Sequence, residues 1–141
     1  MKTEITLCFD FGNSRKKLAV FSNKKIIAER ILYTDTSGEI ETLLHEFKPQ
    51  KSILSSVINH NPGIEDTLKE KTHFHKLSVA TKLNFTAPVG KPETIGADRL
   101  AIAAAAVHFF PKKNNLVIGL GSCITFNFIS QQHEFLGGAI S

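Results

Sequence analysis

The sequence contains no tryptophan and only one tyrosine and one methionine, whereas 11 of its 141 residues are phenylalanine. Phenylalanine brings apolar area without a polar group, so these aromatics are expected to pack inside the protein rather than to form a binding surface. Only two cysteines are present, Cys8 and Cys123, and both lie in apolar, strand-like runs. This scarcity excludes a disulfide framework and predicts two buried free thiols in a reducing, cytoplasmic protein.

Long hydrophobic runs are also missing. The longest helical apolar run, Leu100–Phe110, is well short of the ~20 residues that a membrane span needs. Glu4 stands where the apolar core of a signal peptide would begin, so export is not expected. Neither sign of charge dominates, because 17 Lys and Arg against 13 Asp and Glu give a net charge of +4. The lysines are scattered, so attraction to phosphates is permitted but a nucleic-acid partner is not expected.

The order of apolar runs and polar turns favours a layered α/β fold, because strands and helices alternate along the chain. Apolar residues at i, i+3, i+4 and i+7 predict a helix that ends before Pro49, and a shorter helix is expected to open near Pro62. An alanine-rich helix is expected to end at Pro111, before a polar connection at 112–115. The predicted strands cover 5–11, 18–21, 26–33, 52–58 and 74–79, with further strands after 115, and the predicted helices cover 37–48, 61–71 and 93–110.

Two turns in the sequence share one form: an apolar strand, a glycine followed by small or polar residues, and a second strand. Residues 12–14, Gly-Asn-Ser, match residues 121–123, Gly-Ser-Cys. Such turns expose backbone N–H groups, and glycine lets an oxyanion approach the backbone, so the two turns are candidates to grip a polyphosphate. Ordinary hairpins remain the alternative for both. The first turn is the stronger candidate for a phosphate site. Asp10 and Lys17 lie close to it in the sequence, and neither is needed to form a turn.

Four motifs occur in the order and approximate spacing seen in type III pantothenate kinases, which the chain resembles over essentially its whole length. They are DFGNS at 10–14, GADR at 96–99, GLGSCIT at 119–125 and GGAI at 137–140. That family belongs to the acetate and sugar kinase, heat-shock chaperone and actin superfamily. The resemblance implies actin-like (ribonuclease H-like) α/β domains with a mixed sheet and ATP in the cleft between two domains. We expect a first domain over residues 1–113 and the beginning of a second, apparently truncated, over 114–141.

The resemblance further implies ATP-dependent phosphorylation of pantothenate to phosphopantothenate, the first step of coenzyme A biosynthesis, by a cytoplasmic homodimer. Asp10 would arrange Mg²⁺ through water, Asp98 would take the proton from the pantothenate hydroxyl, and Arg99 would hold the pantothenate carboxylate. An arginine fork suits a carboxylate better than a lysine would. The residues implied to bind ATP are Asp10, Gly12, Asn13, Ser14, Lys17, Gly121, Ser122 and Thr125, and those implied to bind pantothenate are Gly96, Ala97, Asp98 and Arg99.

Two positions depart from the family pattern. Gly119 stands where the family usually has aspartate, and Asn127 replaces another frequent acid. The family pattern implies a monovalent cation, K⁺ or NH₄⁺, and these substitutions remove carboxylates associated with it. They also keep open a second hypothesis, a noncatalytic nucleotide-binding or transcriptional accessory module of the same fold.

Several candidate residues have a purely structural alternative. An aspartate at position 98 is favoured by the helix dipole near a helix start, without any catalytic duty. Lys16 and Lys17 fit a solvated strand face as well as a phosphate site. His73 and His75 share one strand face, but no third ligand lies nearby in the sequence, so we expect exposed strand residues rather than a metal site.

Overall fold

The computed structural model describes residues 2–141 and divides into two compact units, residues 1–76 and 77–141. In the second unit, helix α3 (Ala97–Phe109) packs on strands β6 (Asn115–Leu120) and β7 (Ile124–Ile129). The boundary expected at residue 113 therefore falls inside the second unit. The polar segment expected to connect domains is instead the turn between α3 and β6, where Lys112 adopts a φ of 63°.

The first unit is built on a five-stranded mixed sheet with the strand order β3-β2-β1-β4-β5. The first three strands are antiparallel, whereas β4 pairs parallel to β1 and β5 pairs parallel to β4. The α/β class with a mixed sheet, expected from the sequence, is thereby confirmed. The strand bounds are β1 Ile5–Phe11, β2 Lys16–Ser22, β3 Lys25–Leu32, β4 Lys51–Ser56 and β5 His73–Lys76.

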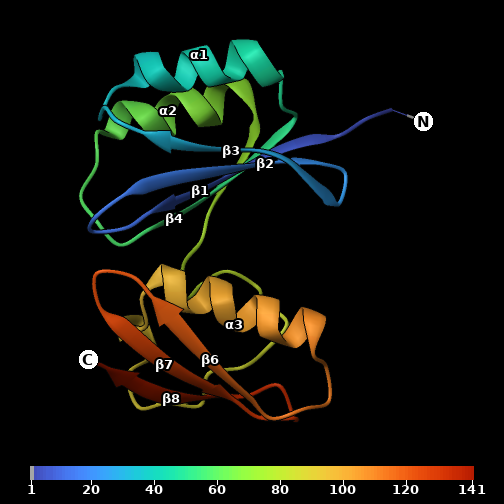
Figure 1. Cartoon of the computed structure of the whole chain (residues 1–141), viewed down its shortest axis with the longest axis vertical. Helices are drawn as coiled ribbons and strands as arrows, with labels where there is room; N and C mark the ends of the chain where they lie inside the picture. Colours follow the sequence, from blue (N-terminus) through green and yellow to red (C-terminus); the bar gives the residue numbers. More distant parts are fainter. Residues whose placement is uncertain (1) are drawn as a thin grey trace. The chain divides into compact units, whose positions relative to one another are not determined.

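Helices α1 (Ser37–Phe47) and α2 (Pro62–Lys71) lie on the same side of this sheet (Figure 1). Alternate residues of β1 point toward them, because side chains of a strand alternate between its two faces. The core of the first unit therefore lies between the helices and one face of the sheet. Its fully buried members are Leu7, Phe11, Val20, Ile40, Leu54, Ile64 and Leu68.

Both helices begin and end where the sequence supplies capping groups. The Thr36 hydroxyl accepts a hydrogen bond from the Glu39 N–H at the start of α1, and Asn61 caps α2 through the Gly63 N–H at 2.9 Å. Helix α1 ends at Phe47, and its C-cap residue Lys48 adopts the left-handed conformation before Pro49. The predicted positions of both helices are confirmed.

The second unit consists of α3 and the antiparallel sheet β6-β7-β8, in which β8 spans Phe135–Ile140. Its core is formed by one face of this sheet, α3 and the loop after β5. The helix begins four residues later than expected, because Pro92–Thr94 forms a separate 3₁₀ turn. Strand β5 also ends at Lys76 rather than at residue 79, because Leu77 is buried in the core of the second unit.

The two cysteines differ from expectation in their surroundings. Both are free, but Cys123 is exposed and Cys8 is half-buried. The prediction of two buried thiols is therefore wrong for Cys123, which lies in the β6–β7 turn rather than inside a strand. Partial burial raises the pKa of the Cys8 thiol, which keeps it protonated and unreactive at neutral pH.

Candidate functional site

The first glycine turn joins β1 to β2 and is closed by one internal hydrogen bond. The Gly12 N–H donates to the Arg15 carbonyl at 2.9 Å, so this amide is not available to a ligand. In residues 2–141 the N–H groups of Asn13 and Ser14 have no hydrogen-bond partner. Two of the residues implied to bind phosphate therefore offer unpaired donors at an exposed loop.

Asp10 lies in a row of three polar residues that crosses the sheet beside this turn. It pairs with Lys17 of β2 on one side and with Ser55 of β4 on the other. Directly opposed residues of neighbouring strands place their side chains on the same face, so these three groups are neighbours. The row contains an anion, a cation and a hydroxyl at the carboxyl ends of two parallel strands, which is where ligands bind in many α/β folds.

Ser55 is a candidate that the sequence interpretation did not name. Its hydroxyl oxygen is buried and has no hydrogen-bond partner in the described residues. Buried polar atoms are nearly always paired, so this orphaned hydroxyl next to Asp10 can form a hydrogen bond with a ligand. Sequence reasoning placed residue 55 on a strand, and only the parallel register with β1 reveals its neighbour.

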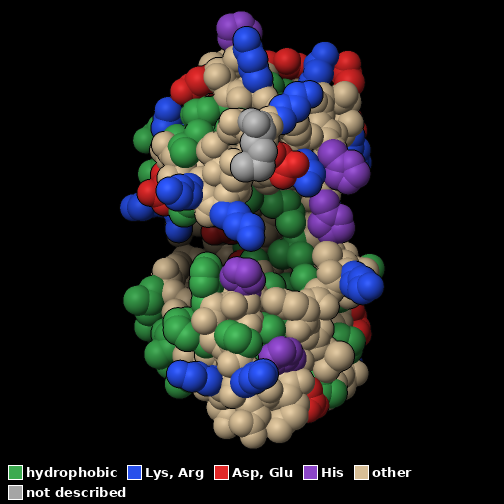
Figure 2. Space-filling model, turned by 90° about the vertical axis from the view of Figure 1, so that its right-hand side faces the viewer, with side chains coloured by type: hydrophobic (Ala, Val, Ile, Leu, Met, Phe, Trp, Pro, Cys, Tyr) green, Lys and Arg blue, Asp and Glu red, His purple; other side chains and the backbone are tan. Residues whose placement is uncertain are grey.

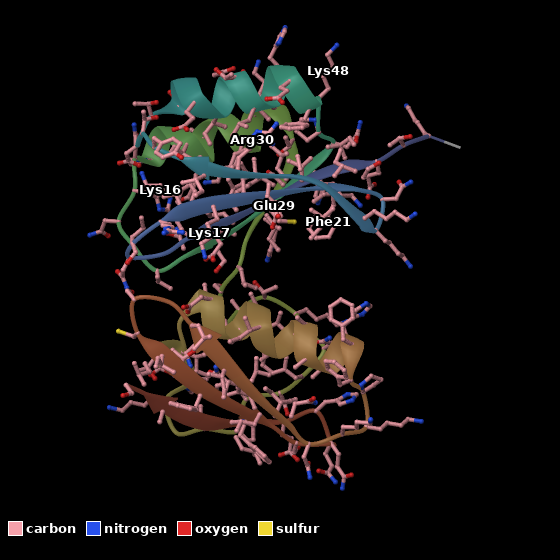
Figure 3. All side chains as sticks on the ribbon, in the orientation of Figure 1. Lys16, Lys17, Phe21, Glu29, Arg30 and Lys48 are labelled. Atoms are coloured by element: carbon pink, nitrogen blue, oxygen red, sulfur yellow. The ribbon has the colours of Figure 1, made fainter. Side chains whose placement is uncertain are left out.

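The two neighbouring lysines of β2 have different surroundings, and they lie on opposite sides of the sheet (Figure 3). The Lys16 ammonium forms an ion pair with Asp35 at 3.3 Å and lies 5.8 Å from the centre of the Phe11 ring. Hydrogen bonds from the Asn61 backbone lower the pKa of Asp35, so this pair stays charged. Lys16 is therefore structural, whereas Lys17 has no partner among residues 2–141 and is exposed beside Asp10.

A buried polar network supports the end of β1 from the helix side of the sheet. The His60 ring packs edge-on against Phe11, accepts or donates a hydrogen bond at Ser56 at 3.0 Å, and contacts Glu65 at 2.7 Å. Lys76 reaches the same Glu65 carboxylate at 3.1 Å. Partial burial opposes ionisation of Glu65, but the hydrogen bonds from Lys76 and His60 lower its pKa overall. The network fixes the segment that precedes the first turn.

The second glycine turn, between β6 and β7, is shorter and more exposed. The Gly121 N–H donates to the Cys123 carbonyl at 3.1 Å, and Ser122 is exposed. Thr125 is the third residue of this unit that the resemblance implies to bind phosphate. Its hydroxyl already accepts a hydrogen bond from the Asn127 side chain at 3.2 Å. The Thr125 hydroxyl is thus bound to Asn127 within β7 rather than presented at the turn.

Asp98 and Arg99 lie in the first turn of α3, which has Gly96 as its N-cap residue. The Gly96 carbonyl accepts hydrogen bonds from the N–H groups of Arg99 and Leu100, both at 3.1 Å. One oxygen of the Asp98 carboxylate accepts from the Arg99 N–H at 2.8 Å, and the other has no partner in the part of the chain described. Gly96 and Ala97 act in this arrangement by starting the helix.

The Arg99 guanidinium lies over β7 and β8, held by neutral groups. Its Nε donates to the Asn127 side-chain oxygen at 2.6 Å, and its central carbon lies 5.5 Å from the Phe135 ring centre. A methyl group at Gly138 would collide with the Phe126 carbonyl group and would also lie 3.0 Å from Arg99 Nη2, so a glycine is needed here first for the pairing of β8 with β7. Within the described residues no carboxylate forms an ion pair with Arg99.

The two histidines of β5 and the remaining charged residues were also considered as candidates. His73 and His75 are exposed on β5, as expected. In residues 2–141 no three His, Cys, Asp or Glu side chains are grouped to hold a metal, and no helix is long and apolar enough to cross a membrane. On the face drawn in Figure 2, Lys and Arg side chains are dispersed among other residues rather than gathered into a basic stripe.

A mixed α/β protein with two glycine turns and an acidic–basic pair at a helix start is what the sequence motifs indicated. The family model described as type III pantothenate kinase matches residues 6–141, and the chain belongs to this family.

Curated relatives agree with this assignment. The chain is 37% identical over 139 residues to a type III pantothenate kinase of Christiangramia forsetii, and the match covers 97% of this chain and 57% of the relative. It is 33% identical to the type III pantothenate kinase of Flavobacterium johnsoniae, over 96% of this chain and 56% of the relative. The chain therefore spans little more than half the length of these relatives.

Among solved structures, a Ppx/GppA family member of Aquifex aeolicus superposes with a TM-score of 0.47 and 16% identity, over 99% of this chain and 51% of that chain. YeaZ of Pseudomonas aeruginosa superposes with a TM-score of 0.41 and 6% identity, over 97% of this chain and 66% of that chain. Likenesses of this degree carry no argument about what the chain does.

Proposed function

We propose that this protein transfers the γ-phosphoryl group of ATP to the hydroxyl of pantothenate. Membership of the type III pantothenate kinase family supports the reaction class. The observation that carries the proposal is the pair at the start of α3. Among residues 2–141, one carboxylate oxygen of Asp98 has no hydrogen-bond partner and Arg99 has no carboxylate partner. Pantothenate offers a matching pair of groups, a hydroxyl to be activated and a carboxylate to be held.

Each residue has a role that its surroundings permit. The free oxygen of Asp98 accepts the proton of the substrate hydroxyl, and the Arg99 guanidinium binds the substrate carboxylate. Phosphoryl transfer depends mainly on positioning and charge neutralisation, so an oriented nucleophile and fixed cations are the groups it needs. Gly96 and Ala97 fix the helix start that carries both side chains.

The phosphate groups are assigned to the two glycine turns, each within its own unit. In the first, the unpaired N–H groups of Asn13 and Ser14 bind phosphate oxygens, Gly12 closes the turn, and Lys17 supplies positive charge. In the second, Gly121 closes the turn and Ser122 is exposed to a ligand. Thr125 takes part only by giving up its bond to Asn127 or by holding that residue in place.

The groups near Asp10 fit Mg²⁺. This ion prefers oxygen ligands, keeps several waters and usually takes one or two carboxylates together with substrate phosphates. Asp10 supplies the carboxylate, and the orphaned hydroxyl of Ser55 lies next to it in register. When bound, the ion would neutralise developing charge on the phosphates.

The test is direct assay of the product. We define the extended chain as residues 1–141 followed by the unmatched remainder of the Christiangramia forsetii relative. With ATP, Mg²⁺ and pantothenate, the extended chain is expected to form phosphopantothenate, detected by ³¹P NMR. Absence of product from a folded, monodisperse extended chain, with the relative itself active under the same conditions, would contradict the proposal.

A second candidate is a noncatalytic nucleotide-binding or accessory module. Two neutral residues favour it, because Gly119 and Asn127 stand where the family usually has acids. Calorimetry with ATP and Mg²⁺ separates the candidates: tight ATP binding by the extended chain without phosphopantothenate formation supports the module, and turnover excludes it. For the 141-residue chain alone we expect weak ATP binding or none, because each turn offers few unpaired amides.

A further inference from the structure

Strand β4 carries three serines, and among the described residues only one of them has an unpaired hydroxyl. The Ser52 hydroxyl forms a hydrogen bond with Thr72 Oγ1 at 2.6 Å, and the Ser56 hydroxyl donates to the Ile58 carbonyl at 3.1 Å. Ser55 is buried, with an exposed fraction of 8%, but its hydroxyl oxygen has no hydrogen-bond partner in residues 2–141. A buried hydroxyl without a partner costs stability, because the hydrogen bonds that it made to water in the unfolded chain are lost.

The register of the sheet places this hydroxyl beside charged groups. Ser55 lies opposite Asp10 of β1, and Asp10 lies opposite Lys17 of β2, on the face of the sheet away from α1 and α2 (Figure 3). The pairing of β4 with β5 ends at Leu54 and Lys76, so β5 places no residue opposite Ser55. The Ser55 hydroxyl therefore has a carboxylate beside it on one strand and no paired strand residue on the other side.

The hydrogen bond that Ser55 does not make within the chain can be made to an oxygen atom of a ligand. A serine hydroxyl donates one hydrogen bond, and donation to a charged oxygen is stronger than donation to a neutral one. Asp10 supplies a carboxylate and Lys17 a positive charge in the same row. A carboxylate suits a hydrated Mg²⁺ ion and a cation suits the phosphates that the ion accompanies, so the row as a whole matches a Mg²⁺–polyphosphate ligand.

We propose that Ser55 is a further binding residue of the first phosphate site, and that its hydroxyl donates to an oxygen atom of the Mg²⁺–polyphosphate ligand that Asp10 and Lys17 receive. This inference rests on the proposed function, because ATP is the polyphosphate considered there. The accepting oxygen belongs to a phosphate group or to a water molecule carried by the ion, and the two are equivalent as acceptors. On this account the hydroxyl at position 55 is kept for binding and lowers the stability of the ligand-free chain.

The ligand test is calorimetry of the extended chain with ATP and Mg²⁺, without pantothenate, so that no turnover is needed. Ser55→Ala is expected to weaken ATP binding at least ~10-fold, the usual cost of losing a hydrogen bond to a charged group. Ser55→Thr keeps the hydroxyl and is expected to stay within about 3-fold of the wild type, since threonine suits a strand. The matched control is Ser52→Ala, the same change on the same strand at a serine bonded to Thr72, and it is expected to bind ATP like the wild type.

Repeating the titrations in EDTA separates the two sources of the accepting oxygen. If a phosphate oxygen accepts the hydrogen bond, the difference in affinity between the wild type and Ser55→Ala persists without the metal. If the water molecule carried by the ion accepts it, the two affinities become equal in EDTA. Both results support a binding role for Ser55, and they assign its acceptor.

A second readout needs no ligand and uses the 141-residue chain. Ser52→Ala is expected to lower the midpoint of chemical denaturation, because it removes a hydroxyl that is bonded in the folded chain. Ser55→Ala is expected to leave the midpoint unchanged or to raise it, because it removes a buried hydroxyl that has no partner among residues 2–141.

Three results would overturn the inference: no ATP binding by the folded wild-type extended chain, equal ATP affinity of wild type and Ser55→Ala with Mg²⁺, or a midpoint of Ser55→Ala as low as that of Ser52→Ala. The last result would show that the Ser55 hydroxyl is already bonded within the folded chain, and it is obtained even where the extended chain does not fold. Failure of the proposed function looks different, because the extended chain would then leave pantothenate unphosphorylated while Ser55→Ala still weakened ATP binding.

Discussion

Gly119 and Thr125 face each other across β6 and β7 so closely that a methyl group on Gly119 would lie 2.5 Å from the Thr125 hydroxyl oxygen. The same hydroxyl binds the Asn127 amide, which in turn holds Arg99. Positions 119 and 127, which the motif resemblance marks as departures from the family pattern, are therefore parts of one packed arrangement.

This contact predicts the effect of restoring the family's usual residue. Gly119→Asp is expected to lower the free energy of unfolding by about 1–3 kcal/mol, the usual cost of overpacking a well-filled site. Chemical denaturation of the 141-residue chain measures the change. Adding Thr125→Ala is expected to recover part of the loss, because it removes the oxygen that the new side chain meets. A Gly119→Asp chain as stable as the wild type would show that the strands separate freely here.

The absence of carboxylates at 119 and 127 predicts a weak response to monovalent cations. The extended chain is expected to phosphorylate pantothenate at similar rates in K⁺ and in Na⁺, because neither position supplies the negative charge that the family pattern associates with the cation. A rate titration with each salt at constant ionic strength tests this. A steep K⁺ requirement would show that other groups supply the ligands.

Much of the local structure could be predicted from the sequence. The bounds of β1 agree with the predicted strand, and the apolar spacing within 37–47 correctly indicated α1, because both depend on patterns contained in a short segment. The sheet on which α3 packs could not be predicted in this way. Its alanine-rich face shows that it is buried, but not which sheet buries it, and the polar residues at 112–115 are as suitable for a tight turn as for a linker.

Some residues of the candidate site could be named from the sequence for the same reason. Asp10, Asp98 and Arg99 could be named as candidates because they occur in motifs that are contiguous in the sequence. Ser55 could not be named as a candidate, because its position beside Asp10 depends on the parallel pairing of β1 with β4. The link from Arg99 to Asn127 spans 28 residues and depends on how α3 packs, so the sequence suggested only that Asn127 was unusual.

The network of His60, Glu65 and Lys76 predicts a pH-dependent contribution to stability. Glu65→Gln is expected to lower the free energy of unfolding by about 1–3 kcal/mol at neutral pH, because its partners stay partly buried with a weaker acceptor. The folded-state pKa of Glu65 lies below its ordinary value, 4.5. The contribution is therefore fully present above that value and is lost as the pH falls through the lower folded-state pKa.

Thermal unfolding from pH 7 to pH 3 measures this difference, and the gap between wild type and Glu65→Gln is expected to close in acid. Glu70→Gln is the matched control, because the Glu70–Lys71 pair is exposed and is expected to change stability by less than about 0.5 kcal/mol. A gap that is constant over the whole range would assign the effect of Glu65 to packing rather than to its charge.

The face of β6 away from α3 predicts self-association of the 141-residue chain. Leu116, Ile118 and Leu120 alternate along this strand with exposed fractions of 61%, 50% and 79%. Apolar patches of this kind are usually covered, and a second copy of the same face is the cover available to the isolated chain. Light scattering is expected to show a mass above that of a monomer, and Leu116→Lys with Ile118→Lys is expected to restore the monomer. Val79→Lys, on a loop, serves as the control and should associate like the wild type. A wild-type chain that stays monomeric at high concentration would contradict association through this face of β6.

The most direct test of the account is the turnover number of the extended chain carrying Asp98→Asn, measured with saturating ATP and pantothenate. A group that accepts the substrate proton contributes about 10²–10⁴-fold to the rate, so a loss of that size is expected, with the stability of the fold nearly unchanged. If Asp98 only favours the start of α3, the variant loses about 0.3–1 kcal/mol of stability and keeps its turnover. Undiminished phosphorylation of pantothenate by Asp98→Asn would contradict the account.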